Sequence, residues 1–330
     1  MAVAPQLAPF ELVDLRTVRA RSLAPLLEEE RRHWAEELHW DYRPSAEMIR
    51  KHLDARTLPG VAALVHGRLA GYCFYIFDDG KAILGDLYVL REYRRERPAG
   101  RAAGVATLLL ERALETLEGS PRLRRLEAQV IPWGIEPLAP LFLARDFSSF
   151  PRVFMYKPLA ATAAGAAEPR LGLRLTTWED SYFEEMAALI VEAYRGHVDS
   201  RINDQYSHSQ GALRFLKNIV IFPGCGVFLP ETSLVAFEPG SERLLGAALT
   251  SRVAAGVAHV TQVCVAPDWQ KRGLGRRLME EIVAGLGARG YRGVSLTVTA
   301  ENEPAVKLYR RLGFDVIKGF AAFARDLIAH

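Results

Sequence analysis

The chain has 330 residues, of which 49% are hydrophobic and 25% are charged, and its formal net charge is +3 at pH 7. This length suggests about two domains, and the composition excludes a disordered chain. The small net charge argues against a nucleic-acid partner, and no apolar run reaches the ~18 residues that a membrane helix needs. Because the N-terminus lacks the basic region of a secretion signal, we expect a cytoplasmic protein with no membrane partner.

The three cysteines, Cys73, Cys225 and Cys264, have no spacing typical of a metal or redox site. Their number is odd, so they do not indicate a complete set of disulfides. We expect buried small side chains in a reducing compartment, and we predict no metal site.

The first half of the chain is expected to run from an apolar strand at 83–89 into a glycine turn and then a helix. A strand at 126–130 and a short helix follow and lead to Phe147. The loop at 91–99 is rich in arginine and glutamate; it either reshapes a ligand site or is a solvated excursion of the surface. The turn reads Arg101-Ala102-Ala103-Gly104-Val105-Ala106, and the helix places Val105, Leu109, Ala113 and Leu117 on one face.

Small residues bounded by prolines fill positions 159–170, and this composition predicts a linker. It separates two halves, 1–158 and 171–330. In the second half, helical periodicity is found at 183–194, at 212–220, after Gly273 and from Asn302. Strands are expected at 173–176, 226–229, 233–238, 244–252, 258–265, 294–298 and around 314–323. This alternation predicts an α/β protein with a mixed sheet flanked by helices.

The most informative segment is a glycine turn between a strand and a helix. It reads Gln270-Lys271-Arg272-Gly273-Leu274-Gly275-Arg276 and follows the apolar run 260–265. Two glycines let the backbone approach a ligand closely, and the first N–H groups of a helix have no partner within it. Such a corner favours phosphate. It is neither a dinucleotide fingerprint nor a P-loop, because Leu278 stands at the third glycine position and no Gly-Lys-Ser/Thr follows.

In its context, this segment resembles the pyrophosphate loop, Q/R-x-x-G-x-G/A, of the GNAT N-acetyltransferase superfamily, which binds coenzyme A. The family loop follows a strand that ends like 263–268 here, Val-Cys-Val-Ala-Pro-Asp. Downstream, Asn302, Tyr309, Gly313 and Phe314 match the family pattern N-x(6)-Y-x(3)-G-F. The resemblance covers about 171–325. It implies a mixed, mostly antiparallel sheet flanked by helices, in which two neighbouring strands splay apart around the pantetheine arm.

The two halves share one layout, which indicates a duplication. Gly104 and Gly273 are 169 residues apart, and Phe147 and Phe314 are 167 residues apart. We therefore predict two tandem GNAT domains, 1–158 and 171–330. This layout is similar to that of the mycothiol synthase family, which acetylates a small amino-thiol sugar. The first copy has Phe142 opposite Tyr309, Ile135 opposite Asn302 and Asp146 opposite Gly313, so we expect it to be degenerate and the second copy to be catalytic.

The resemblance implies acetyl-CoA as cosubstrate, held largely by backbone groups of the loop and of the strand before it. Asn302 also suits the N-cap of a helix that begins with Glu303 and Pro304, and both roles are kept open. The predicted coenzyme-binding residues are Val263, Cys264, Val265, Gln270, Lys271, Arg272, Gly273, Leu274, Gly275, Arg276 and Asn302.

Two side chains are predicted to be catalytic. Tyr309 stands where the family carries a tyrosine near the coenzyme sulfur, which makes it the general acid; alternatively, it is a core aromatic. Proton transfer from a phenol with a pKa near 10 to a thiolate near 8.5 is uphill by about 2 kcal/mol. His259 lies fourteen residues before Gly273, where histone-acetylating relatives carry a glutamate, and alternation places it on the face of Thr261, Val263 and Val265. It is either a base or a structural histidine of the sheet.

The acceptor is predicted only as a class, a primary amine of a small molecule or protein. The polar segment 194–204 breaks the helical pattern and is either a wall of the cleft or a solvated loop. Trp34, His39, Trp40, Asp41 and Tyr42 are expected to anchor the end of a helix in the core. The alternative functions are a non-catalytic acyl-CoA sensor or scaffold, and an acetyltransferase for an amino-thiol.

Overall fold

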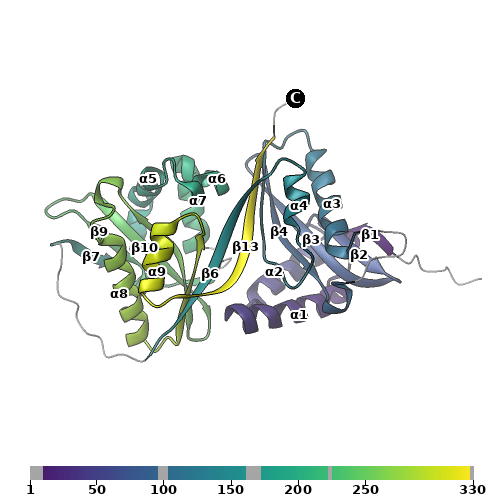
Figure 1. Cartoon of the computed structure of the whole chain (residues 1–330), viewed down its shortest axis with the longest axis horizontal. Coiled ribbons are helices and arrows are strands. Elements are labelled where there is room, and N and C mark those ends of the chain that lie inside the picture. Colours follow the sequence, from purple (N-terminus) through teal and green to yellow (C-terminus); the bar gives the residue numbers. More distant parts are fainter. Residues whose placement is uncertain (1–9, 96–102, 161–171, 222–224, 328–330) are drawn as a thin grey trace, which may run out of the picture. The chain divides into compact units, whose positions relative to one another are not determined.

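A computed structural model describes residues 10–95, 103–160, 172–221 and 225–327. The chain divides into two compact units. Unit 1 comprises residues 1–36, 42–151 and 320–330, and unit 2 comprises residues 37–41 and 152–319. Figure 1 traces the chain through both units by colour.

Unit 1 contains a six-stranded sheet in the order β1-β2-β3-β4-β5-β13. Its neighbours pair antiparallel except β4 and β5, which are parallel. Its strands are β1 (Phe10–Asp14), β2 (Gly60–Val65), β3 (Arg68–Asp78), β4 (Lys81–Val89), β5 (Arg125–Val130) and the end of β13 (Asp315–Asp326). Its helices are α1 (Ala20–Leu38), whose last two residues fall in unit 2, α2 (Arg43–Asp54), α3 (Val105–Glu118) and α4 (Ala139–Leu143).

Unit 2 repeats this plan with the order β7-β9-β10-β11-β12-β6. Again one neighbouring pair, β11 and β12, is parallel and the others are antiparallel. Its strands are β6 (Ser148–Pro158, from residue 152), β7 (Arg174–Thr177), β9 (Leu234–Phe237), β10 (Leu244–Ala254), β11 (Val257–Val265) and β12 (Gly293–Thr299), with the short β8 (Val227–Phe228) beside β10. Its helices are α5 (Phe183–Ala193), α6 (Val198–Ile202), α7 (Ser209–Val220), α8 (Leu274–Ala288) and α9 (Glu303–Arg311).

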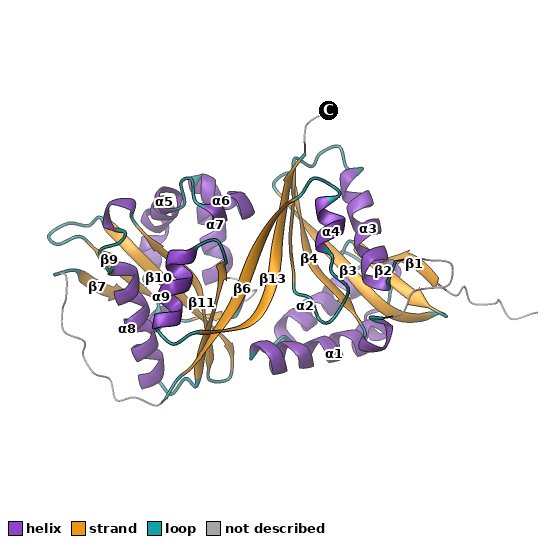
Figure 2. Ribbon diagram, viewed as in Figure 1, coloured by secondary structure: helices purple, strands orange, loops and turns teal. Residues whose placement is uncertain are grey.

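Helices cover both faces of the sheet of unit 2, as Figure 2 shows. On one face, α8 buries a stripe at helical spacing, and Tyr309 of α9 joins the same cluster; the stripe consists of Leu274, Leu278, Ile282 and Leu286. On the other face, α5 and α7 bury Met186, Ile190 and Leu216 against Ala247 and Leu249 of β10. This arrangement confirms the α/β class and the mixed, mostly antiparallel sheet.

The predicted elements of the second half all occur, and their ends shift by a few residues. The helix at 105–118 in the first half also forms as expected and buries Val105, Leu109, Ala113 and Leu117. Of the cysteines, Cys73 and Cys264 are buried, as expected, whereas Cys225 is exposed, so that prediction is wrong for Cys225. The predicted linker lies largely in 161–171, and much of the long loop before Gly104 lies in 96–102, both outside the described residues.

The compact units do not follow the two sequence halves. Residues 321–326 of β13, at the end of the second half, pair with β5 of unit 1. Residues 152–158 of β6, at the end of the first half, pair with β12 of unit 2. Each sheet is therefore completed by the last strand of the other copy. The domain boundaries predicted from the sequence separate the two copies along the chain, not the two compact units. As boundaries of the copies they stay a prediction.

Phe323 should contribute strongly to the stability of unit 1. It is 3% exposed and stacks on Phe142 with ring centroids 4.0 Å apart. We expect Phe323→Ala to lower the free energy of unfolding by about 3–5 kcal/mol and to raise hydrogen exchange in 125–130, as measured by urea titration and mass spectrometry. Phe77→Ala, at a side chain that is 57% exposed, is the control. A loss below about 1 kcal/mol for Phe323→Ala would contradict the assignment of the chain end to unit 1.

Candidate active site

The two parallel strands of unit 2 separate along their length. They pair from Val257 and Gly293 to Val260 and Leu296. Beyond this point β11 continues to Val265 and β12 continues to Thr299, and no further pair joins these two fully described strands. Unpaired backbone groups along such an opening are available to a ligand that lies between the strands. This geometry agrees with the splay that the family resemblance implied.

A β-bulge in β11 lies at the start of this opening. In the pairing with β10, Leu249 faces Gln262, but the next residue, Thr250, faces Val260. Thr261 is therefore the extra residue of the bulge. Because side chains alternate with a strict period of two, one extra residue moves every later side chain to the opposite face.

The bulge overturns the predicted face of His259. Ala258 and Val260, before the bulge, belong to the cluster under α8 and α9, and Val263 and Val265, after it, pack against the same cluster. His259 consequently points to the opposite face of the sheet from Val263 and Val265. The expectation that these three side chains share a face was wrong, since simple alternation does not hold across a bulge.

The backbone of Val263 and Val265 faces away from β10. The Tyr194 hydroxyl donates to the Val263 carbonyl at 3.2 Å, and the Gln270 side-chain amide donates to the Val265 carbonyl at 3.2 Å. Both carbonyls therefore point toward the opening. Cys264, between them, directs its backbone to β10 and its side chain into the core, so only its two neighbours have the orientation that the coenzyme prediction requires.

The glycine loop forms an open corner at the start of α8. Gly273 has φ +92°, which favours glycine, and a Cβ placed on it would meet nothing within 4 Å among the described residues. Gly275 lies inside the first turn, and a Cβ placed on it would have the Val265 side chain as its nearest neighbour, at 3.6 Å. Leu274 is 1% exposed and anchors the helix in the core. The start of α8 thus has open space around the Cβ position of Gly273, and the first N–H groups of a helix have no partner within it, as a phosphate site requires.

The basic side chains around this loop differ in whether an acidic side chain of the protein already pairs with them. Arg276 forms an ion pair with Glu280 at 2.7 Å, whereas neither Lys271 nor Arg272 forms an ion pair within the described parts of the chain. The guanidinium of Arg272 lies 5.2 Å from the ring centroid of Trp269. Lys271 and Arg272 are therefore the cations best able to neutralise a bound anion.

Asn302 is the N-cap of α9, as one of its two predicted roles requires. Its side-chain oxygen accepts from the Ala305 backbone N–H at 3.3 Å, and its side-chain nitrogen lies 3.2 Å from His197 Nε2. The capping role is confirmed. The role in coenzyme binding remains a prediction.

Tyr309 lies on α9 and is 8% exposed. Burial raises the pKa of its hydroxyl above the usual value of 10, and the charge of Asp199 raises it further. Phe314 packs beside its ring at 6.0 Å. Its hydroxyl has no hydrogen-bond partner among the described residues. The group is therefore neutral at pH 7 and remains able to donate.

The segment that links α5 to α7 forms a polar wall beside the separated strands. Tyr194 contacts β11, where its hydroxyl also accepts from the Gln262 amide at 3.0 Å. Asp199 contacts β12, where it accepts a short hydrogen bond from the Thr299 hydroxyl. From the sequence the role of this segment was open, and neither residue stood out in it. The break in helical periodicity at Tyr194 was the signal that pointed here.

His259 lies in the part of β11 that still pairs with β12, before the two strands separate. Its Nδ1 is 2.8 Å from the Ser295 hydroxyl, and its ring lies 5.1 Å from Trp40 and 5.5 Å from Phe154. Burial, with a smaller effect from Arg152, lowers the pKa of His259 to about 3. A ring that holds a proton so weakly is a poor acceptor for the proton of an amine, and this environment weighs against the predicted base.

The equivalent corner of unit 1 is filled by a side chain of the protein itself. Glu136 Oε1 accepts from the backbone N–H of Thr107 at 3.1 Å and from its hydroxyl at 2.6 Å. A Cβ placed on Gly104 would lie 2.1 Å from the other carboxylate oxygen. An internal anion thus caps the first turn of α3. Phe142, at the position of Tyr309, is fully buried and offers no hydroxyl.

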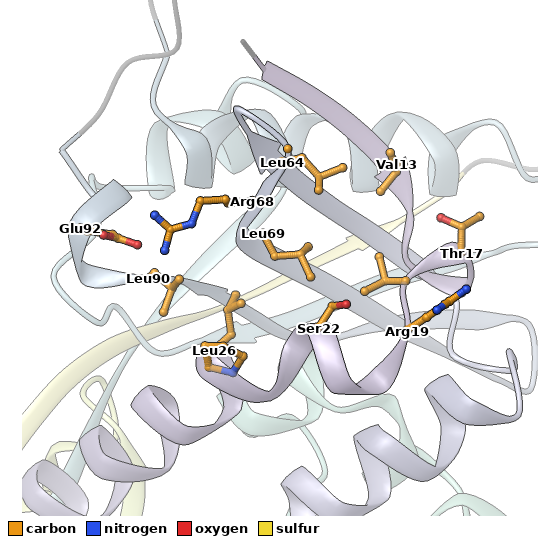
Figure 3. A pocket seen from close by; sticks show the side chains of 13 residues that line it. Val13, Thr17, Arg19, Ser22, Leu26, Leu64, Arg68, Leu69, Leu90 and Glu92 are labelled. Carbon is orange, nitrogen blue, oxygen red and sulfur yellow. The ribbon is translucent and has the colours of Figure 1, made fainter. Parts of the chain in front are cut away.

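A cavity of about 520 Å³ lies elsewhere, in unit 1, between α1 and the β2–β3 hairpin (Figure 3). Leu26, Leu64, Leu69 and Leu90 line it, with Arg68 and Glu92 nearby. Every predicted coenzyme or catalytic residue belongs instead to unit 2. Among the described residues, no three potential ligands gather to hold a metal ion, and no helix is long and apolar enough to cross a bilayer.

Comparison with known proteins identifies the family. The model of the acetyltransferase (GNAT) family matches twice, at residues 21–142 and 198–314, which together make up most of the chain. The chain therefore belongs to the GNAT acetyltransferase family and contains two copies of its domain.

Relatives and a solved structure support this assignment. A mycothiol acetyltransferase of Saccharomonospora viridis is 29% identical over 239 residues, which cover 69% of this chain and 72% of that protein. Another, from Thermobifida fusca, is 40% identical over 108 residues, but the match spans only 30% of this chain and 33% of that relative. A tandem GNAT protein from the clavulanic acid biosynthesis pathway has a TM-score of 0.59 and 16% identity, with coverage of 96% and 98%, and supports the tandem fold.

His259 should make the protein sensitive to mild acid. Its pKa is about 3 when folded and near 6.5 when unfolded, so only the unfolded state takes up a proton between these values. Its stabilising contribution is complete above pH 6.5 and falls as the pH drops toward 3. Between pH 7 and pH 5, we expect the free energy of unfolding, measured by urea titration, to fall by about 2 kcal/mol less for His259→Gln than for the unmodified chain. Equal losses would contradict the buried neutral ring.

Proposed function

We propose that the second copy, residues 171–330, transfers an acetyl group from acetyl-CoA to a primary amine of a small molecule or protein. One observation carries this proposal: the open glycine corner at Gly273 adjoins two separated strands whose carbonyls face the gap. This arrangement can accept a diphosphate at the helix start and an extended amide-containing arm between the strands. The residues present thus fit acetyl-CoA, whereas the filled corner of unit 1 does not.

Each part of the coenzyme has a matching group. The N–H groups of Gly273, Leu274 and Gly275 would bind the pyrophosphate, with Lys271 and Arg272 supplying charge. The backbone of Val263 and Val265 would pair with the pantetheine arm. On binding, Gln270 and Tyr194 would release the two carbonyls that they now occupy or share them with the ligand.

The reaction needs no covalent enzyme intermediate. The acceptor ammonium releases a proton to water, and its neutral nitrogen attacks the thioester carbonyl carbon. The C–N bond forms, the C–S bond breaks, and the nitrogen loses a second proton to water as it becomes an amide. The thiolate takes a proton, and the group that gives it regains one from water. Tyr309 would donate a hydrogen bond, and ultimately its proton, to that sulfur. Because burial raises the pKa of Tyr309, stabilisation of the developing charge by its hydrogen bond is the larger part of this role.

The relatives named mycothiol acetyltransferase support an enzyme rather than a sensor. A scaffold would not require a donor hydroxyl beside the separated strands, and Tyr309 retains one. An acetyltransferase of the second copy is the function that the site supports best.

Gly273→Glu should abolish the binding of acetyl-CoA, because the new carboxylate enters the phosphate corner and a side chain strains φ +92°. The measurement is isothermal titration calorimetry on the full chain. Gly290→Glu is the matched control: Gly290 is also exposed, has φ +77° and has open space around it. Unchanged affinity in Gly273→Glu would refute the loop assignment.

The same titration counts the sites. We expect one tight site per chain, since Glu136 occupies the corner of unit 1. Two tight equivalents would show that the first copy also binds the coenzyme.

Tyr309→Phe removes only the hydroxyl. We expect kcat to fall about 100-fold or more, while the affinity for acetyl-CoA and the thermal stability change little, because the hydroxyl lacks a partner in the described protein. Steady-state assays of thiol release and calorimetry would measure the two effects. Tyr291→Phe, which packs against the same cluster, is the control. An unchanged kcat would remove Tyr309 from the chemistry.

A further inference from the structure

We propose that Asp199 binds the acceptor as a protonated primary amine, beside Tyr309 and between the separated strands. This inference rests on the proposed function, since it assigns the second substrate of the same site. No predicted site residue supplied a partner for the acceptor, and His259 lies below the opening. Asp199 is the carboxylate that the structure brings to the opening itself.

The position of Asp199 is fixed by its contacts. It belongs to α6, whose N-cap is His197, and it follows Tyr194 and His197 along the polar wall. The hydroxyl of Thr299, the last residue of β12, donates to Oδ1. Through Tyr194 and Asp199, this one segment contacts Val263 of β11 and Thr299 of β12, both beyond the last paired residues of these strands.

Asp199 is close enough to Tyr309 for its charge to act on that hydroxyl. The charge of Asp199 contributes to the raised pKa of Tyr309, and also to those of Tyr194 and Tyr206. A carboxylate near the proposed acid disfavours a second negative charge there. A bound ammonium would offset that negative charge until it releases its proton.

Asp199 lacks a permanent cation. Its side chain is 17% exposed, and its nearest basic neighbour is His197, with Nδ1 3.6 Å from Oδ2. That ring nitrogen accepts a hydrogen bond from the Asp199 backbone N–H at 3.2 Å, so it does not donate to the carboxylate in this arrangement. Among the described residues no lysine or arginine forms an ion pair with Asp199. A mostly buried carboxylate without a cation is costly, and a cationic ligand supplies the missing charge.

This arrangement specifies a class of acceptor. An aliphatic primary amine, with a pKa near 10.4, is cationic at pH 7, whereas an aromatic amine is neutral. Asp199 should therefore favour aliphatic amines by their charge. The hydrogen bond from Thr299 engages Oδ1, and Oδ2 lies next to His197.

The test compares Asp199→Asn with the unmodified full chain. Thiol release is measured with acetyl-CoA and a panel of aliphatic amines (glucosamine, spermidine and a lysine ester) and with aniline as the neutral acceptor. We expect the KM for the best aliphatic amine to rise about 10- to 100-fold, with the affinity for acetyl-CoA unchanged and aniline little affected. Thr299→Val, which frees the carboxylate to move, should raise the same KM less.

Asp315→Asn is the matched control, because it removes an exposed carboxylate of unit 2 by the same chemical change. If acetyl-CoA does not bind the unmodified chain, the proposed function fails. If acetyl-CoA binds but no aliphatic amine is acetylated, or if Asp199→Asn raises the KM for aliphatic amines and aniline equally, the role of Asp199 is overturned and the coenzyme site stands.

Discussion

The separation of β11 from β12 after Val260 and Leu296 is the constraint on which the site depends. Two parallel strands that stayed paired to their ends would satisfy each other's backbone groups and leave nothing for a ligand. The bulge at Thr261 accompanies the separation. It keeps Val263 and Val265 packed on the core under α8, while their carbonyls face the gap. Because of this one extra residue, the same stretch of β11 has buried side chains on one face and backbone groups that are open to a ligand. Both properties are needed to hold an extended ligand arm.

The two copies share this separation of parallel strands but differ at the start of the following helix. Unit 1 also separates its parallel pair after Leu84 and Ala128, and it also has a bulge, between the residues that face Phe74 and Tyr75. Its backbone frame is therefore intact. Its helix start is nevertheless satisfied by the carboxylate of Glu136, and a phenyl ring replaces the phenol. A helix N-terminus favours an anion, and an internal carboxylate meets that preference without a coenzyme.

The sequence could predict what depends on local patterns. The turn at Gly273, the N-cap at Asn302 and the stripe on α8 each follow from spacing or residue type, and the structure contains them. The face of His259 could not be predicted, because a bulge is a property of two paired strands and leaves no mark in the alternation of one. Nor could local patterns show that residues 321–326 complete the sheet of unit 1, since two duplicated strands suit either sheet equally well. Trp40 and His39 were expected to anchor the end of a helix in the core; Trp40 lies against Phe154 and His259, and His39 lies against Tyr156, all within unit 2. Asp199 escaped notice because a single polar residue in an irregular segment has no periodicity to reveal its orientation.

The site divides its tasks between backbone and side chains, and this division has consequences for specificity. The groups offered to the donor are mostly main-chain amides and carbonyls, which almost any sequence supplies once glycine is present at the turn. In the proposed site, the groups offered to the acceptor are side chains of one short segment, 194–199, which is attached to the sheet by two hydrogen bonds to different strands. A substitution there can change the charge or size of the acceptor without altering the coenzyme site. A family with this arrangement can keep one donor and exchange acceptors, and in the site proposed here the carboxylate of Asp199 selects the acceptor by its charge.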